Sequence, residues 1–220
     1  MRYAIYYCPS DDSELGQFGR TWLAQDGEGL PVLDVERADA LLADVCRYGW
    51  HATLRAPFEL SQGASCTALR NAVAVVAAAT PAFELPLQLD RLAGFLALRP
   101  HGASTAVDAL AAACLYALEP LRAPLSTEVF QRRALNIDAT ERLLLQRYGY
   151  PYVLDRYRFH MTLSAPATAF EEQRLRDWLT PRVAALGAAR VDALAICGEE
   201  APGASFHVIE RIALQGAKAA

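Results

Sequence analysis

No part of this 220-residue sequence is apolar for long enough to cross a membrane. The longest uninterrupted apolar run, residues 109–118, is ten residues long, whereas a transmembrane helix needs roughly 20. Residues 1–9 contain a single arginine and a short apolar stretch that Pro9 interrupts, which is not the pattern of a secretory signal peptide. We therefore expect no membrane span, and we expect residues 2–8 to form a strand.

Cysteine spacings typical of disulfide frameworks or compact zinc sites are also missing. The five cysteines are an odd number, they include no C-x-x-C pair, and long irregular gaps separate them. This pattern favours reduced thiols in a cytoplasmic protein. It also leads us to expect no metal and no other cofactor.

A basic excess is the third missing feature. The 21 Lys and Arg residues are outnumbered by 25 Asp and Glu residues, which gives a net charge of −4 and a pI near 5.6. Proteins that bind long nucleic acids through the phosphate backbone normally carry more positive than negative charge. A small ligand is the better expectation, and the sequence leaves the oligomeric state open.

What is present is a globular composition, 53% hydrophobic and 21% charged, with an order of elements that occurs twice. A strand, a helix and two further strands are predicted in residues 40–100 and again in residues 150–214. We expect one two-lobed domain over residues 1–220, built from these two repeats. The predicted strands are 48–60, 83–89, 95–98, 157–163, 191–197 and 206–214, and the predicted helices are 13–25, 37–46, 67–79, 104–118, one ending before Gly149, and 170–186.

The two repeats are similar at the level of residues. Residues 48–57 (YGWHATLRAP) align without gaps on residues 157–166 (YRFHMTLSAP), with six identities at an offset of 109 residues. An offset of half the chain indicates an ancient duplication rather than an array of short repeats.

Each repeat contains a His-x-Thr element. Alternation along a strand places His51 and Thr53 on one face, and likewise His160 and Thr162. Two imidazoles can act as base and acid near neutral pH, and two hydroxyls can hold phosphoryl oxygens, which suits metal-free cleavage of a phosphodiester. Given the threonine content, two such elements among four histidines arise by chance with a probability of about 0.01.

Other interpretations of the histidines stay open. A single His-x-Thr element is more often an ordinary strand or surface feature, and a zinc site built on two histidines would need further ligands. We expect His101, in a Pro-His-Gly turn, to lie at the surface and His207 to be structural.

Three further residues are candidates for substrate binding. Arg55 shares the strand face of His51 and Thr53 and could bind a phosphate, although its counterpart in the second repeat is Ser164. Tyr6 could stack on a base or sugar, with core packing as the alternative. Arg133, beside Arg132 in a polar stretch, could reach a charged substrate, with an exposed charge pair as the alternative.

Taken together, these motifs resemble the two-histidine (2H) phosphoesterase superfamily, and more closely its branch encoded in phosphonate-utilisation operons. The resemblance spans most of the chain and is weakest over residues 11–34 and after Leu214. It implies an α+β fold of two lobes, each an antiparallel sheet flanked by helices, with the active site in the cleft between them. The segments that carry it are 2–7 (RYAIYY), 48–54 (YGWHATL), 149–153 (GYPYV) and 158–163 (RFHMTL).

The resemblance also implies an activity. His51 and His160 would be the acid and base, in an order that the sequence does not decide, and Thr53 and Thr162 would hold phosphoryl oxygens. The substrate would be a small phosphodiester, with a cyclic sugar phosphodiester from phosphonate breakdown preferred. The alternative is a module that binds a phosphoryl ligand without chemistry. Whether the loop of residues 26–31 closes over a substrate is a further open question.

Overall fold

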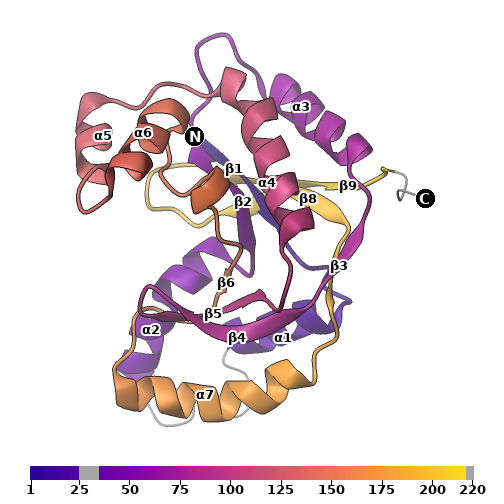
Figure 1. Cartoon of the computed structure of the whole chain (residues 1–220), viewed down its shortest axis with the longest axis vertical. Coiled ribbons are helices and arrows are strands. Elements are labelled where there is room, and N and C mark those ends of the chain that lie inside the picture. Colours follow the sequence, from indigo (N-terminus) through magenta and orange to yellow (C-terminus); the bar gives the residue numbers. More distant parts are fainter. Residues whose placement is uncertain (25–34, 217–220) are drawn as a thin grey trace.

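The computed structural model describes residues 1–24 and 35–216 (Figure 1); the loop predicted at residues 26–31 lies outside them. Within the described residues the chain forms the elements β1 (Arg2–Tyr7), α1 (Glu14–Ala24), α2 (Val35–Tyr48), β2 (Ala52–Phe58), α3 (Cys66–Ala79), β3 (Phe83–Leu85), β4 (Leu87–Leu92), β5 (Phe95–Pro100), α4 (Thr105–Leu118), η1 (Glu119–Leu121), α5 (Thr127–Arg133), α6 (Ala139–Tyr148), η2 (Leu154–Arg156), β6 (Met161–Thr162), α7 (Ala169–Ala184), β7 (Ala189–Val191), β8 (Ala193–Glu199) and β9 (His207–Ala213).

Most strands belong to one sheet of seven, in the order β4-β5-β6-β2-β1-β8-β9, and a separate ladder joins β3 to β7. Every pairing between these strands is antiparallel. The predicted α+β class with antiparallel sheets and flanking helices is confirmed. The two His-x-Thr strands, β2 and β6, are neighbours at the middle of this sheet.

Helices cover the sheet in two groups, which gives the molecule its two lobes (Figure 1). In one lobe α3 packs on α4, β8 and β9, and α4 packs on β2. In the other, α7 packs on β4, and α1 joins the same lobe because Trp22 donates to the Leu163 carbonyl and its ring contacts that of Trp178.

The two repeats exchange hairpins between these lobes. The β4-β5 hairpin of the first repeat pairs through β5 with β6 of the second, whereas the β8-β9 hairpin of the second repeat pairs through β8 with β1, the neighbour of β2. Each lobe therefore contains strands from both halves of the chain.

Several elements differ from those predicted. The strand predicted at 83–89 is divided at Pro86, which has no N–H to donate to a ladder, and its parts β3 and β4 belong to different sheets. The strand predicted at 191–197 is likewise divided into β7 and β8. Only Met161 and Thr162 of the strand predicted at 157–163 pair as a ladder.

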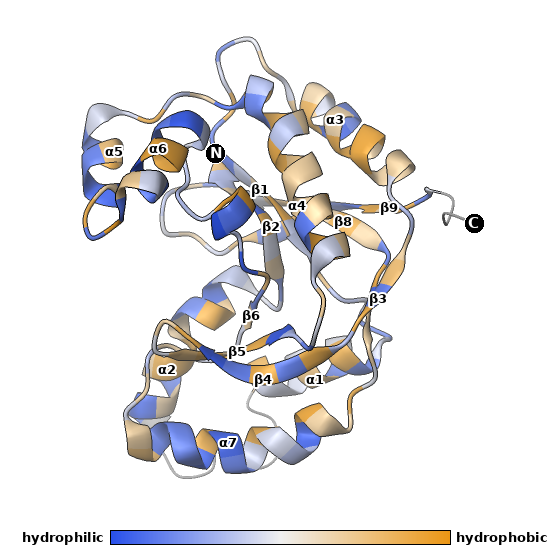
Figure 2. Ribbon diagram, in the orientation of Figure 1, coloured by the Kyte–Doolittle hydropathy of each residue, from blue (hydrophilic) through white to orange (hydrophobic). Residues whose placement is uncertain are grey.

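The largest core cluster lies between the helices and the sheet and includes Leu54 and Leu163, which are 4% and 0% exposed. These leucines follow the two His-x-Thr elements and point away from them, as strand alternation predicts. Apolar residues dominate α3, α4 and β8, whereas α5 and α7 are largely hydrophilic (Figure 2). Among the described residues, no helix combines the length and apolar character that a membrane span requires.

Candidate active site

The register between β2 and β6 brings the two His-x-Thr elements together. Ala52 pairs with Met161 in an antiparallel ladder. One residue further in each direction, this register sets His51 against Thr162 and Thr53 against His160. Side chains at such cross-strand positions lie about 5 Å apart at their Cβ atoms. Each histidine therefore has the threonine of the other repeat as its cross-strand neighbour.

A backbone carbonyl two residues earlier orients each imidazole. Nδ1 of His51 lies 2.9 Å from the Gly49 oxygen, and Nδ1 of His160 lies 2.7 Å from the Arg158 oxygen. A carbonyl only accepts hydrogen bonds, so each Nδ1 carries the proton and each neutral ring has an unprotonated Nε2. In His51 this Nε2 can accept from the Thr53 hydroxyl. Gly49 adopts φ +73°, a left-handed conformation that glycine accommodates without strain.

Burial keeps both imidazoles neutral. Desolvation is the main cause that lowers the pKa of His51 to about 4, and the charge of a protonated His160 lowers it further. Desolvation also lowers the pKa of His160, with a smaller contribution from the charge of Arg99. The effect of His160 on the pKa of His51 indicates that the two rings belong to one site.

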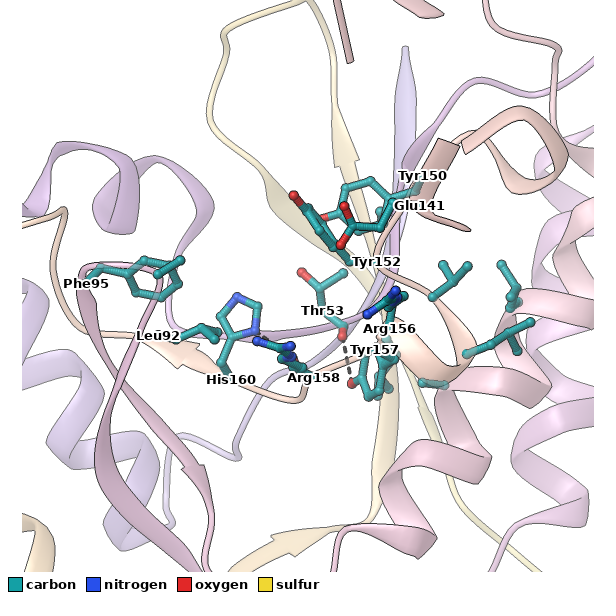
Figure 3. A pocket seen from close by; sticks show the side chains of 17 residues that line it. Thr53, Leu92, Phe95, Glu141, Tyr150, Tyr152, Arg156, Tyr157, Arg158 and His160 are labelled. Carbon is teal, nitrogen blue, oxygen red and sulfur yellow. Dashed lines mark hydrogen bonds between the residues drawn. The ribbon is translucent and has the colours of Figure 1, made fainter. Parts of the chain in front are cut away.

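Two adjoining cavities open at this junction. The His160 cavity, about 320 Å³, contains His160, and the His51 cavity, about 410 Å³, contains His51 and Thr162. Figure 3 shows the His160 cavity, with His160 and Thr53 at its open centre. Four residues line both cavities, so the two form the arms of one cleft: Thr53, Ala56, Tyr150 and Tyr152.

The structure places Tyr6 beside a catalytic candidate. Its ring centroid lies 4.0 Å from that of His51, and the Tyr6 side chain lines the His51 cavity although the residue is only 1% exposed. Thr53 Oγ1 lies 3.4 Å from Nε2 of the same histidine. Tyr6 and Thr53 therefore contact His51 from two directions.

Of the two neighbouring arginines, only Arg133 reaches the cleft. It lines the His51 cavity, and its Nη1 donates to the Gly149 carbonyl at 2.7 Å. Arg132 is exposed and lines neither arm of the cleft.

Arg55 does not lie on the strand face of His51 and Thr53, where the sequence predicted it. Tyr6 pairs with Thr53 but Ile5 pairs with Arg55, so β2 carries one extra residue, Leu54, relative to β1. Such a bulge reverses the alternation beyond it and turns Arg55 to the helix-covered face. Its guanidinium is 1% exposed and pairs with Glu119 at 2.9 Å. Arg55 is therefore placed to support the fold and not to contact a ligand.

Two further residues at the cleft, Tyr157 and Arg158, were not predicted from the sequence. Tyr157 donates to the Thr53 carbonyl at 2.9 Å, which holds the backbone of β2 (Figure 3), and the match between Tyr48 and Tyr157 in the aligned repeats was its only signal. Arg158 lines the His160 cavity, but glycine is its counterpart in the first repeat. His101 and His207 are both exposed and line neither arm. In residues 1–24 and 35–216, no three His, Cys, Asp or Glu side chains gather as metal ligands would.

Comparison with known sequences identifies a family. Residues 53–207 match the family described as "Protein of unknown function (DUF1045)". Two curated proteins named ribose 1,5-bisphosphate phosphokinase PhnN are each 36% identical: that of Janthinobacterium sp. (strain Marseille) over 98% of this chain and 51% of its own length, and that of Laribacter hongkongensis (strain HLHK9) over 94% and 50%. The chain thus spans about half the length of these relatives.

Comparison with solved structures concerns the fold. TT0787 of Thermus thermophilus is 12% identical and superposes with a TM-score of 0.50 over 98% of this chain and 99% of that chain. E. coli LigT complexed with NADP+ is 14% identical, with a TM-score of 0.44 over 97% and 96%. The chain belongs to the DUF1045 family, and it shares its fold with TT0787, in agreement with the α+β fold that the resemblance to the two-histidine phosphoesterases implies.

Proposed function

We propose that the chain is a metal-independent phosphodiesterase that hydrolyses a small phosphodiester, with a cyclic one preferred. One observation carries this proposal: two imidazoles, each with Nδ1 bound to a backbone carbonyl, share one cleft with two threonine hydroxyls. A base, an acid and hydroxyl donors are the groups that in-line hydrolysis at phosphorus needs.

In the proposed reaction, His51 Nε2 takes a proton from water because its low pKa leaves it unprotonated at neutral pH. The water oxygen bonds to phosphorus as the bond from phosphorus to the leaving oxygen breaks. Protonated His160 gives its proton to that leaving oxygen, since the bound anionic phosphodiester favours the imidazolium. Thr53 and Thr162 donate to the non-bridging oxygens, and proton exchange with solvent resets both histidines.

The proposed substrate is a sugar phosphodiester from phosphonate breakdown. The two arms, about 320 and 410 Å³, suit a small ligand. The resemblance to the phosphonate-operon branch supports this substrate, and so do the two curated relatives, which are named as kinases of ribose 1,5-bisphosphate.

The test measures hydrolysis of 2′,3′-cyclic nucleotides with EDTA present. We expect His51→Ala and His160→Ala each to reduce kcat by about 10²-fold to 10⁴-fold, as is typical for loss of an acid or base. His207→Ala is the matched control, because His207 is exposed and outside the cleft. Turnover that survives both cleft substitutions would overturn the proposal, and loss of turnover on chelation would show that a metal takes part.

The same preparation tests the non-catalytic alternative. Calorimetry with a 2′,3′-cyclic nucleotide measures binding independently of turnover. Micromolar binding without product over several hours would identify a phosphoryl-binding module instead of an enzyme.

A further inference from the structure

The two arms of the cleft differ in charge. Arg2 and Arg133 both line the His51 cavity. Arg2 is neutralised by an ion pair with Glu199, a carboxylate that is 0% exposed. Arg133 donates to the Gly149 carbonyl, and within residues 1–24 and 35–216 no carboxylate lies at ion-pair distance from it. The His51 cavity thus presents one uncompensated positive charge.

That charge has an unfavourable environment in the free protein. Arg133 is half-buried, and its pKa is lowered by burial and by the neighbouring charge of Arg2. A partly desolvated cation gains most from an anion that enters the cavity. Only Nη1 of Arg133 donates to the Gly149 carbonyl, so the other guanidinium nitrogens remain able to donate to phosphate oxygens.

The arginines of the His160 cavity are either paired or solvated. Arg156 pairs with Asp138 at 2.8 Å. Glu141 also lines this cavity, but it lies beside Tyr150 and Tyr152 and away from Arg158 (Figure 3). Arg158 is exposed to solvent, unlike the half-buried Arg133. Much of the remaining wall is apolar, formed by residues such as Phe95 and Leu115. This arm suits the less polar part of a ligand.

We propose that the substrate carries a second phosphate group, a monoester, which Arg133 binds in the His51 cavity while the phosphodiester lies between the two histidines. The substrate class is then a phosphorylated sugar or nucleoside cyclic phosphodiester. This inference rests on the proposed function, because it takes the junction of the two arms as the place of the scissile phosphate.

The test compares two probes, cytidine 2′,3′-cyclic phosphate with and without a 5′-phosphate. We expect wild-type kcat/KM to be roughly 10-fold or more higher for the phosphorylated probe, as a charge-assisted bidentate contact provides. In Arg133→Gln the ratio between the probes should fall to about 1. Arg133→Lys keeps the charge and should retain part of the preference. Arg132→Gln, next in sequence but outside the cleft, should keep the full ratio.

Calorimetry with His160→Ala protein separates this inference from the proposed function. If wild-type protein hydrolyses neither probe, the proposed function fails for this class, but tighter binding of the phosphorylated probe, lost on adding Arg133→Gln, still supports the anion site. Equal handling of both probes, or a preference that Arg133→Gln leaves intact, overturns the inference. A preference lost only in Arg158→Gln would place the second phosphate in the other arm and overturn it as well.

Discussion

The centroid of the Tyr6 ring, on β1, lies 4.0 Å from that of His51, which directly precedes the neighbouring strand β2, and the two rings are tilted by 32°. Among the described residues no hydrogen bond is found at the Tyr6 hydroxyl, so the ring itself provides the contact. We expect Tyr6→Phe to retain nearly full kcat, whereas Tyr6→Leu should lower kcat by about 5-fold because an aromatic contact of about 1 kcal/mol is lost. Steady-state kinetics would check this. An equal loss in Tyr6→Phe would show that the hydroxyl matters instead.

The threonines should matter through their hydroxyls. Thr53→Val and Thr162→Val keep the shape but remove the donor, and each should lower kcat by about 10²-fold, the usual effect of losing one donor to a transition-state oxygen. Thr53→Ser and Thr162→Ser retain the donor and should stay within a few-fold of wild type. If the valine variants change KM alone, the hydroxyls contribute to ground-state binding only.

The low pKa of His51 makes the folded state acid-sensitive. The unfolded chain binds a proton at this imidazole below pH 6.5, but the folded protein does so only near pH 4. Stability from this group is therefore complete above pH 6.5 and decreases as the pH falls towards 4. Between pH 7 and pH 4 we expect the free energy of unfolding to fall by about 3 kcal/mol more in wild type than in His51→Gln.

Urea denaturation at a series of pH values measures this difference, with His207→Gln as the exposed control. Wild-type and His51→Gln curves that run parallel would contradict the expected burial of His51.

The Arg55–Glu119 pair should be important for stability. Arg55 is buried, and it also donates to the Tyr148 carbonyl at 3.1 Å. In Glu119→Gln its charge would stay buried without a counter-ion, at a cost of about 3–5 kcal/mol. Glu210→Gln, in the partly exposed Arg70–Glu210 pair, should cost at most about 1 kcal/mol. Thermal or urea unfolding compares the two variants, and similar losses would refute the assigned role of Arg55.

Elements whose formation depends on residues close together in the sequence were predicted from the sequence. The helix predicted at residues 170–186 is one example: α7 covers Ala169–Ala184, and Thr168 and Glu171 form a capping box at its start. Strand alternation likewise placed His51 and Thr53 on one face. The position of Arg55 could not be predicted in this way, because a bulge at Leu54 depends on how β2 pairs with β1.

The pairing of strands that are far apart in the sequence could not be predicted either. The two His-x-Thr strands were expected to face each other across a cleft from similar halves. In the structure they are adjacent in one sheet, and the pairing of Ala52 with Met161 decides which threonine meets which histidine. Arg133 reaches the cleft because the turn at Gly149, where φ is +72°, presents a carbonyl to it.

The position of β1 in the sheet has a consequence for folding. Its neighbours are β2, close in sequence, and β8, in which Glu199 pairs with Arg2. Contacts between residues so far apart in sequence slow folding, because a long loop must close before they form. On the ribosome, β1 has one edge without its partner until β8 emerges, and this apolar strand is exposed to mispairing during that interval. We expect this sheet to be completed only after β8 has been synthesised, and we expect the chain to be most prone to aggregate before that point.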